Sequence, residues 1–491
     1  MRIIVIGSGF GGLAAAIRLQ AQGHQVTIVE QRDQAGGRAY VYRQDGFTFD
    51  GGPTIITAPW LIDDLFTLAG KKTADYVKIV PIDPFYRIRF EDGTVFNYNA
   101  DRPALLAQIR AFNPEDEKGY FKFLKSSESV FDAGMSLIDK PFTRLMDMVK
   151  VLPDLIRLRA DRTVAGVVNS SIRDPRLRQV FSFHPLLVGG NPFQTTSIYG
   201  LIHHLEQKWG VWFAMGGTGA LVEAFVKLFQ DIGGTIRYST PVEEITVDER
   251  SGRATGVRLK GGETLTSDSV VSNGDLPATY KRLIKPQFRK KYTDERIDHI
   301  DYSMSLVVIY FGTNKKYENI AHHEIIMGPR YKELLVDVFD KKILAKDFSL
   351  YLHRPTATDP SLAPEGSDAF YVLSPVPHLG GSTDWSKAGK PYRDAIIKYL
   401  EDRYMPDLSK HIVSELMIDP VHFRDVLSSE KGAAFSVQPT LFQSAWFRPH
   451  NRSEDIPNLY FAGAGTHPGA GLPGVISSGK IVADLIGRST N

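Results

Sequence analysis

The first thirty residues combine two apolar runs with a cluster of glycines. Residues 1–6 (MRIIVI) predict a buried strand, and residues 13–21 predict a helix because they are good helix formers without proline. Residues 25–29 (QVTIV) predict a second strand, which ends at Glu30. The succession of strand, glycine turn, helix and strand predicts a βαβ unit, which builds a parallel sheet.

Later parts of the chain show other patterns. Residues 85–90 and 94–98 alternate with period 2 around the turn at Asp92-Gly93, which predicts a β-hairpin. Residues 100–210 are mostly helical in pattern and are broken by several prolines. Three aromatic-rich strands are predicted at 306–311, 348–352 and 370–373. They suit the floor of an apolar substrate domain, although three ordinary core strands would have the same composition.

The C-terminal region has a strand, a glycine loop and a helix in the same order as the N-terminus. Residues 458–462 (NLYFA) predict the strand, residues 463–475 (GAGTHPGAGLPGV) form the loop, and the helix is expected from about Ile476 to Ile486. Pro473 stands near the first position of that helix, where its fixed φ angle is favourable. The positive end of the helix dipole would face whatever occupies the loop.

The N-terminal glycines have the spacing of a dinucleotide-binding turn. Gly7 permits the tight turn, Gly9 lets the backbone approach a pyrophosphate, and Gly12 lets the helix pack closely on the strand. Free N–H groups at the helix N-terminus would bind the phosphates. Glu30 lies 18 residues beyond Gly12, close to the spacing of about 20 at which an acid binds a ribose. A dinucleotide is therefore predicted, with a purely structural glycine turn as the alternative; the turn alone does not choose between NAD and FAD.

Two nearby loops could contact the same ligand. Gly36-Gly37 precedes Arg38, whose guanidinium would add a phosphate contact unless the segment is an ordinary surface loop. The stretch 47–54 (FTFDGGPT), with Gly51 and Gly52, is predicted as a loop that would let the backbone approach a flat ring.

Composition narrows the classes of function. The 491 residues hold 58 Lys and Arg and 56 Asp and Glu, a net charge of +2 that gives no reason to expect nucleic acid as a partner. Cysteine is absent, which excludes disulfides, thiolate catalysis and cysteine-bound metal clusters. No run approaches the roughly 18 apolar residues of a membrane-spanning helix, and glycines break the N-terminal apolar run that a signal peptide needs. A cytoplasmic location is expected.

The two ends of the chain resemble the phytoene desaturase family of carotenoid biosynthesis, within the flavin-dependent amine oxidase-like superfamily. The resemblance covers essentially the whole chain and is most specific at residues 463–475 (GAGTHPGAGLPGV), 47–53 (FTFDGGP), 182–193 (SFHPLLVGGNPF) and 443–452 (QSAWFRPHNR). It implies FAD-dependent desaturation of 15-cis-phytoene to lycopene by up to four successive dehydrogenations, via phytofluene, zeta-carotene and neurosporene. Oxygen or a quinone would be the terminal electron acceptor.

The resemblance also implies a non-covalently bound FAD. Its adenosine half would lie on residues 7–38, with Val242 near the adenine, and its ribityl chain and isoalloxazine would lie along residues 463–475. The expected contacts are Gly7, Gly9, Phe10, Gly11, Gly12, Glu30, Gln31, Gly37, Arg38, Gly52, Pro53, Thr54, Val242, Gly463, Gly465, Pro473, Gly474 and Val475. Many relatives in the superfamily have an acid after the glycine that ends the last strand, whereas this chain has Ala464, so the contact to the ribityl hydroxyls is left open.

We therefore predict an α/β fold (α+β overall) whose domains are interleaved in the sequence. A Rossmann-like two-dinucleotide-binding FAD domain would be built from residues 1–80, 211–280 and 441–491. Residues 81–99 and 281–440 would form a β-sheet substrate-binding domain. Residues 100–210 would form a helical lid that contacts the membrane.

The implied reaction removes two hydrogens from a hydrocarbon without a polar group. The flavin would accept a hydride, and the resulting allylic cation would lose a proton to water or to a base. Asp147, an acid among apolar neighbours in the helical region, is the candidate for that base, although most acids on helices face solvent.

A carotenoid substrate predicts contact with a membrane. Burial of one methylene contributes about 0.8 kcal/mol, so a forty-carbon chain prefers lipid to water by on the order of 30 kcal/mol. The enzyme must therefore collect its substrate from a bilayer, which predicts peripheral association with the cytoplasmic membrane. Residues 144–162 mix apolar and basic side chains and could lie on an anionic bilayer surface. An ordinary half-buried helix pair, interrupted at Pro153, is the alternative.

No metal is expected. The pairs His203-His204 and His322-His323 resemble ligands, but neighbours on a helix point about 100° apart and cannot chelate as residues four apart do. Three alternative functions remain: another carotenoid or C30 desaturase or a ketolase, a flavin amine oxidase with an aromatic cage for an amine, and a non-catalytic isoprenoid-binding chaperone of the same fold that lacks a working flavin site.

Overall fold

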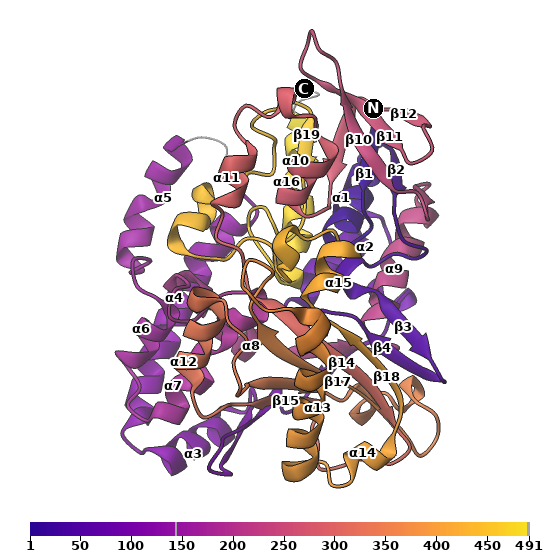
Figure 1. The fold of residues 1–491 in the computed structure, drawn as a ribbon. Helices are drawn as coiled ribbons and strands as arrows, with labels where there is room; N and C mark the ends of the chain where they lie inside the picture. The colour runs from indigo at the N-terminus through magenta and orange to yellow at the C-terminus, as the bar shows by residue number, and fades with distance from the viewer. Residues whose placement is uncertain (143–144, 489–491) are drawn as a thin grey trace.

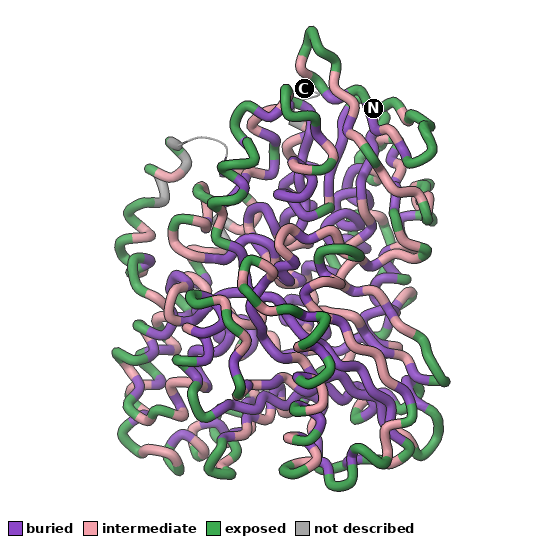
Figure 2. Tube along the Cα trace, viewed as in Figure 1, coloured by how far each residue is buried: buried purple, intermediate pink, exposed green. Residues whose placement is uncertain are grey.

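The computed structural model describes residues 1–142 and 145–488, with all their side chains except those at 135–137, 145, 147, 150, 151 and 488. Figure 1 shows two halves built around sheets, one above the other, with a layer of helices along the left side. Buried residues follow the strands of both halves, and exposed residues gather on the outer helices and turns (Figure 2).

The upper half contains a parallel sheet of five strands. Their order is β19, β13, β1, β2 and β9, and every neighbouring pair runs parallel. The strands are β1 (Arg2–Ile6), β2 (Gln25–Val29), β9 (Thr235–Arg237), β13 (Ser269–Ser272) and β19 (Leu459–Phe461). Strands from three distant parts of the chain meet in one sheet, which confirms the predicted βαβ unit and the α/β class.

Strand β1 is covered on both faces, which explains why its apolar residues do not alternate with polar ones. Ile3 and Val5 belong to a cluster with the helices α1 (Phe10–Ala21), α9 (Gly217–Asp231) and α16 (Leu472–Arg488). Ile4 and Ile6 pack on the opposite face against a second sheet. That sheet is antiparallel and consists of β10 (Val242–Val247), β11 (Ala254–Leu259) and β12 (Thr264–Thr266).

Helices α16 and α1 pack closely because Gly479 has no side chain. A Cβ at Gly479 would lie 2.7 Å from the backbone nitrogen of Ala15 and 2.9 Å from Cβ of Ala14. Helix α16 begins at Leu472, four residues before the predicted start, so Pro473 is its second residue. This earlier start places the helix N-terminus inside the glycine-rich loop.

The lower half contains a mixed sheet of seven strands. Their order is β18, β14, β17, β16, β15, β6 and β7, and all pairs are antiparallel except β15 with β6. The strands are β6 (Tyr86–Arg89), β7 (Val95–Tyr98), β14 (Ser305–Thr313), β15 (His323–Ile326), β16 (Leu350–His353), β17 (Asp368–Val376) and β18 (Ile412–Ile418). Helix α13 (Trp385–Arg403) covers one face. The predicted hairpin and the three aromatic strands are confirmed.

Residues 100–210 are mostly helical, as predicted. The helices are α3 (Arg102–Phe112), α4 (Asp116–Ile138), α5 (Leu145–Arg157), α6 (Val164–Asn169), α7 (Pro175–Ser182) and α8 (Leu201–Trp209). Asp101, Thr163 and Asp174 cap α3, α6 and α7 by accepting backbone N–H bonds. Pro153 lies inside α5, so it does not divide the segment, contrary to the prediction.

The remaining strands and α-helices lie outside the three sheets and the helices named above. They are β3 (Val41–Gln44), β4 (Phe47–Asp50), β5 (Ile79–Ile82), β8 (Val211–Ala214), α2 (Pro59–Leu68), α10 (Leu276–Leu283), α11 (Asp294–Asp298), α12 (Tyr331–Leu335), α14 (Leu408–His411) and α15 (Pro420–Asp425). Strand β5 spans the predicted boundary at residue 80 and pairs with β8. The three domain ranges stay a prediction.

The close packing of α16 on α1 predicts the effect of a single methyl group. Gly479→Ala should lower the free energy of unfolding by about 1–3 kcal/mol, because the new Cβ would press on the backbone of α1. Gly200→Ala is the control, since a Cβ there meets no atom within 4 Å. Urea unfolding compares the two variants with the parent protein. Equal stability of Gly479→Ala and the parent would contradict the packing argument.

The carboxyl group of Asp50, at the end of β4, should make the stability of the folded protein depend on pH. Burial raises its pKa from 3.8 to about 6, although it accepts the N–H of Gly219 at 3.2 Å. The folded state therefore holds the proton more tightly than the unfolded state, and stability falls as pH rises from about 4 to about 6. Asp50→Asn should be more stable than the parent at pH 8, by up to about 3 kcal/mol, and should show no gain at pH 4. Urea unfolding at both pH values measures this, and a gain of the same size at pH 4 and pH 8 would refute it.

Candidate functional site

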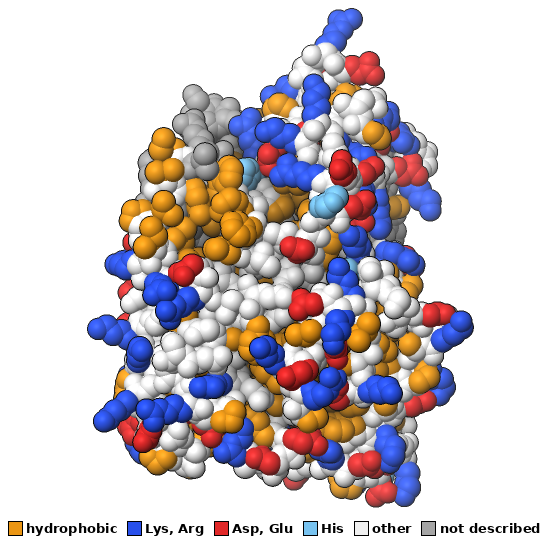
Figure 3. Space-filling model, turned by 60° about the vertical axis from the view of Figure 1, so that its left-hand side comes forward, with side chains coloured by type: hydrophobic (Ala, Val, Ile, Leu, Met, Phe, Trp, Pro, Cys, Tyr) orange, Lys and Arg blue, Asp and Glu red, His pale blue; other side chains and the backbone are white. Residues whose placement is uncertain are grey.

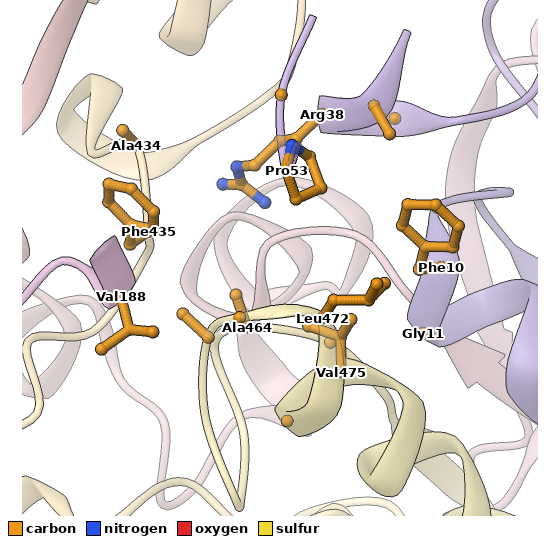
Figure 4. A pocket seen from close by; sticks show the side chains of 18 of the residues that line it. Phe10, Gly11, Arg38, Pro53, Val188, Ala434, Phe435, Ala464, Leu472 and Val475 are labelled. Atoms are coloured by element: carbon orange, nitrogen blue, oxygen red, sulfur yellow. The ribbon is translucent and has the colours of Figure 1, made fainter. Parts of the chain in front are cut away.

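A cavity of about 980 Å³ connects the two halves of the molecule. Every expected cofactor contact except Gly12 lines it, so the structure brings together residues from both ends of the chain. Figure 4 shows Phe10 and Gly11 of α1 on one side, Arg38 and Pro53 above, and Ala464, Leu472 and Val475 below.

The N-terminal glycines are required by close contacts. Gly7 has a φ of +92°, in the left-handed region that favours glycine. A Cβ at Gly11 would lie 3.0 Å from the backbone nitrogen of Gly463, so the first glycine turn touches the C-terminal glycine loop. Gly12 does not line the cavity; a Cβ there would lie 2.3 Å from the carbonyl oxygen of Gly7. Its predicted role in close packing of helix on strand agrees with this contact.

Asn273 links the two glycine segments, and the sequence reasoning missed it. It follows β13, and its Nδ2 donates to the carbonyl oxygen of Ala462 at 2.8 Å. Its side chain also fills the positions that Cβ atoms would take at Gly9 and Gly463, at 2.7 Å and 2.8 Å. One sequence feature could have identified Asn273 as a site residue: it directly follows a buried strand, and ligands bind at the carboxyl ends of parallel strands.

Glu30 lies at the carboxyl end of β2 and is buried. Its Oε2 accepts the backbone N–H of Ser8 at 2.8 Å and the Ser8 hydroxyl at 2.7 Å, and its Oε1 accepts the N–H of Arg32 at 2.9 Å. Glu30 therefore holds the glycine turn itself. A carboxylate has about four acceptor positions, so the predicted ribose contact remains compatible with these bonds.

Arg38 is a partly buried cation with a spare donor. Its Nη2 donates to the Ser429 hydroxyl at 2.6 Å, while its Nε has no hydrogen-bond partner among the described residues. Burial lowers its pKa, an effect that the nearby Asp275 partly opposes. Burial likewise raises the pKa of Asp275, and Arg38 opposes that shift. An anionic ligand would accept from the free donor and offset the positive charge of the guanidinium.

The residues present fit FAD. The glycine turn leaves no room for side chains, the α1 N-terminus offers free N–H groups, and Arg38 supplies a donor for a phosphate. At the other end, α16 points its N-terminus into the loop that contains Ala464, where its dipole favours negative charge. The acid missing at position 464 has no substitute in that loop, but Asp275 lines the same cavity and has an unpartnered Oδ1 among the described residues.

The rest of the cavity is mainly apolar. Its walls come from α4, α5, α8 and the lower sheet, through residues such as Ile138, Leu155, Ile202, Leu205, Ile325 and Leu373. Thr54 lies between the two regions, and its hydroxyl bonds with the hydroxyls of Tyr371 at 2.7 Å and Tyr351 at 3.1 Å. A single cavity thus joins a polar cradle to an apolar chamber.

The helical placement predicted for the two histidine pairs is confirmed for His203-His204, which lie on α8, and is wrong for His322-His323. His323 begins strand β15, His322 precedes it, and the two cluster with His353 on β16, with one ring nitrogen of each within 4.8 Å of the others. Burial lowers the pKa of His322 to about 3 and those of His323 and His353 well below 6.5, so all three are neutral at pH 7. His323 Nδ1 bonds with the Tyr351 hydroxyl at 2.7 Å. The prediction of no metal stays a prediction.

Asp147, the predicted base, belongs to α5, but its side chain lies outside the described ones. Its role stays a prediction.

The geometry at Arg38 predicts its contribution to cofactor binding. Arg38→Ala should weaken FAD binding by about ten- to a hundredfold, because charged hydrogen bonds contribute about 1.5–3 kcal/mol. The dissociation constant of Arg38→Lys for FAD should lie between those of the parent protein and Arg38→Ala. Lysine keeps the positive charge but lacks the planar set of N–H donors of a guanidinium. Arg43→Ala, at a side chain that is 57% exposed, is the control. Titration of apoprotein with FAD, followed by flavin fluorescence, gives the dissociation constants, and an unchanged value for Arg38→Ala would contradict the assignment.

Comparisons with known proteins agree with this geometry. The model of the family described as "Flavin containing amine oxidoreductase" matches residues 10–487. A lycopene-forming phytoene desaturase of Pseudescherichia vulneris is 51% identical over 487 residues, covering 99% of both chains. A neurosporene-forming phytoene desaturase of Rhodobacter capsulatus is 45% identical, covering 99% of this chain and 94% of the relative.

Solved structures show the same fold. An oxidoreductase from Methanosarcina mazei superposes with a TM-score of 0.68 at 15% identity, covering 99% of this chain and 100% of the other. The family match spans nearly the whole chain, and the relatives share about half of its residues. The chain therefore belongs to the flavin-containing amine oxidoreductases, as an FAD-dependent oxidoreductase of the phytoene desaturase family.

Proposed function

We propose that this chain desaturates 15-cis-phytoene to lycopene with FAD as its cofactor and collects its substrate at a membrane surface. The observation that carries the proposal is the single cavity, in which the polar cradle for a dinucleotide continues into an apolar chamber. A hydrocarbon offers no polar group for recognition, so its site must be apolar and must lie next to the reactive ring. The relatives named above act on phytoene, as their names state.

When bound, FAD supplies the hydride acceptor that carbon–hydrogen oxidation needs. The chain's residues hold it at both ends, through the glycine turn with Arg38 and through the loop at 463–475. The apolar walls orient the hydrocarbon and exclude water, which would otherwise capture a carbocation. We propose lycopene as the final product because the lycopene-forming relative is the more similar of the two, at 51% against 45% identity.

The outer face of α5 supports membrane contact. Met146, Val149, Leu152 and Ile156 are 60%, 53%, 48% and 65% exposed. Their spacing of three and four residues places them on one side of the helix. Phe442 and Phe447, in a neighbouring loop that contacts α5, are 74% and 42% exposed. Figure 3 shows hydrophobic side chains gathered on this side of the molecule. We call these six residues the apolar face.

The apolar face borders the cavity. Leu155, on the inner side of α5, lines the cavity, as do Ser444 and Ala445 in the loop between Phe442 and Phe447. A hydrocarbon that leaves a bilayer at this face would therefore reach the chamber without crossing open water. Arg157 and Arg159 near the end of α5 are paired with Asp154 and Asp161, so apolar contact is the main proposed attraction. In the described ranges, no helix has the length and apolar character needed to span a bilayer.

We also propose that oxygen or a quinone reoxidises the cofactor. A quinone is itself lipid-soluble and could enter through the same apolar face. Anaerobic incubation with and without a soluble quinone analogue distinguishes the two acceptors.

The activity itself is tested by incubating the FAD-loaded protein with phytoene in liposomes and analysing the pigments. Lycopene, with phytofluene, zeta-carotene and neurosporene as intermediates, is the expected outcome. Turnover of amines instead of phytoene would favour an amine oxidase. Phytoene that stays unchanged with both oxygen and quinone present would refute the proposal.

Substitutions in the apolar face should weaken membrane binding without changing cofactor binding. Leu152→Ser combined with Ile156→Ser should reduce co-sedimentation with liposomes at least tenfold, because about 1.4 kcal/mol corresponds to a factor of ten and each buried side chain contributes more than this. FAD content should not change.

Leu68→Ser combined with Val413→Ser is the matched control, since these residues are 46% and 50% exposed on other elements. It should co-sediment like the parent protein. Equal loss of binding in both double variants would show that general hydrophobicity, and not the apolar face, holds the protein on liposomes.

A further inference from the structure

One carboxylate among the residues that line the cavity lies outside the cofactor cradle. Four acidic residues occur among the described residues that line the cavity. Glu30, Glu243 and Asp275 belong to the segments that form the cofactor cradle. Glu206 comes instead from α8, next to Ile202 and Leu205, which also line the chamber.

Glu206 is held in a defined orientation. It is fully buried, and its Oε1 accepts the hydroxyl hydrogen of Tyr86 at 2.6 Å. Its Oε2 lies 2.9 Å from Nε2 of His184. Tyr86 is on β6 and His184 begins the short helix at His184–Val188, so two separate elements fix the carboxylate. Burial and Glu206 itself raise the pKa of Tyr86 well above 10, so this phenol remains a donor. Tyr98 is a third neighbour, since burial and Glu206 raise the pKa of its phenol well above 10. A carboxylate has about four acceptor positions, so these neighbours do not use all of them.

A structural role alone does not explain this carboxylate. Glu324, another fully buried glutamate, pairs with Arg87 and Arg89 and so carries its charge among cations. In the described part of the chain, no lysine or arginine forms an ion pair with Glu206, and its basic neighbour is His184. An apolar neighbourhood penalises a carboxylate by several kcal/mol, which hydrogen bonds offset only in part. Glu206 nevertheless belongs to the lining of the chamber, and a few polar groups set in an apolar pocket wall are typical of a functional site.

We propose that Glu206 is the base that accepts the proton lost by the substrate. The proposal rests on the function proposed above and assigns a residue to its second half. Two neighbouring carbon–hydrogen bonds of the hydrocarbon break. One hydrogen leaves with both bonding electrons as a hydride to FAD. The other leaves as a proton to a Glu206 oxygen, and its bonding electrons form the new carbon–carbon double bond.

The charge balance of this step is complete. The carboxylate becomes a neutral carboxylic acid, while the substrate loses two electrons and two hydrogens in total. Oxygen or quinone takes up two electrons and two protons when the cofactor is reoxidised, and one of those protons is the one that Glu206 releases. Tyr86 and His184 are positioning residues, since they act through Glu206.

The test uses Glu206→Gln, which keeps the shape and the hydrogen-bond acceptor for Tyr86 but cannot take a proton at neutral pH. Anaerobic mixing of the FAD-loaded variant with phytoene liposomes should reduce the cofactor at least a hundredfold more slowly than in the parent, the usual size of a general-base contribution. The dissociation constants for FAD and for the liposomes should stay within threefold. A rate above one fifth of the parent's would overturn the proposal.

Two variants separate a catalytic from a structural role. Tyr86→Phe removes one hydrogen bond but keeps the carboxylate, so its rate should fall by less than tenfold. Glu206→Asp keeps a carboxylate on a shorter arm and should recover at least part of the rate. If Tyr86→Phe slows the reaction as much as Glu206→Gln does, the network is structural and the proposal fails.

Chemical rescue covers the case in which Glu206→Gln folds poorly. Glu206→Ala leaves space for a small acid, and formate or acetate should restore at least a tenfold higher rate than buffer alone. If Glu206→Ala still binds FAD but is not rescued, that result counts against the proposal. An inactive Asp147→Asn together with an active Glu206→Gln would also count against it. If the parent protein itself leaves phytoene unchanged, the proposed function fails, whereas an active parent with an active Glu206→Gln refutes the assignment of Glu206 alone.

Discussion

The contact between the two glycine segments is the constraint on which the rest of the structure depends. Gly11 and Gly463 stand 452 positions apart, yet a single methyl group at Gly11 would press against the backbone of Gly463. Asn273 fills the remaining space and bonds to Ala462. Neither loop alone encloses a dinucleotide. The chain must therefore bring β1, β13 and β19 side by side before the cradle exists.

This constraint explains the interleaved organisation. Because the cradle closes only when the last strand joins the first sheet, the lower sheet and the helical layer are inserted between its parts (Figure 1). The same insertion places apolar walls next to the cofactor cradle and makes one cavity out of two chemically different regions. Arg38 and α16 attract charge at one end, while α5 offers an apolar face at the other. The polar end of the cavity therefore suits the cofactor, and its apolar end suits the hydrocarbon.

The parts of the site that depend on local sequence could be predicted, and the parts that depend on long-range contacts could not. The turn at Gly7 and the loop at 463–475 are read from glycine spacing, since short backbone contacts require it. Asn273 and Glu206 carry no motif; their roles come from neighbours such as Gly463 and Tyr86, which are distant in the chain. His322-His323 was assigned to a helix because the pattern was too short to identify β15, and His353 joins them only through strand pairing. The early start of α16 was missed because glycine and proline obscure helix ends.

The central claim is that one cavity holds FAD beside a hydrocarbon that reacts with it. Its most direct test is the flavin absorbance of the FAD-loaded protein after anaerobic addition of phytoene liposomes, with liposomes lacking phytoene as the blank. We expect loss of the oxidised flavin band and formation of one phytofluene for each cofactor reduced. An oxidised band that persists under excess phytoene, in protein that binds both FAD and the liposomes, would contradict it.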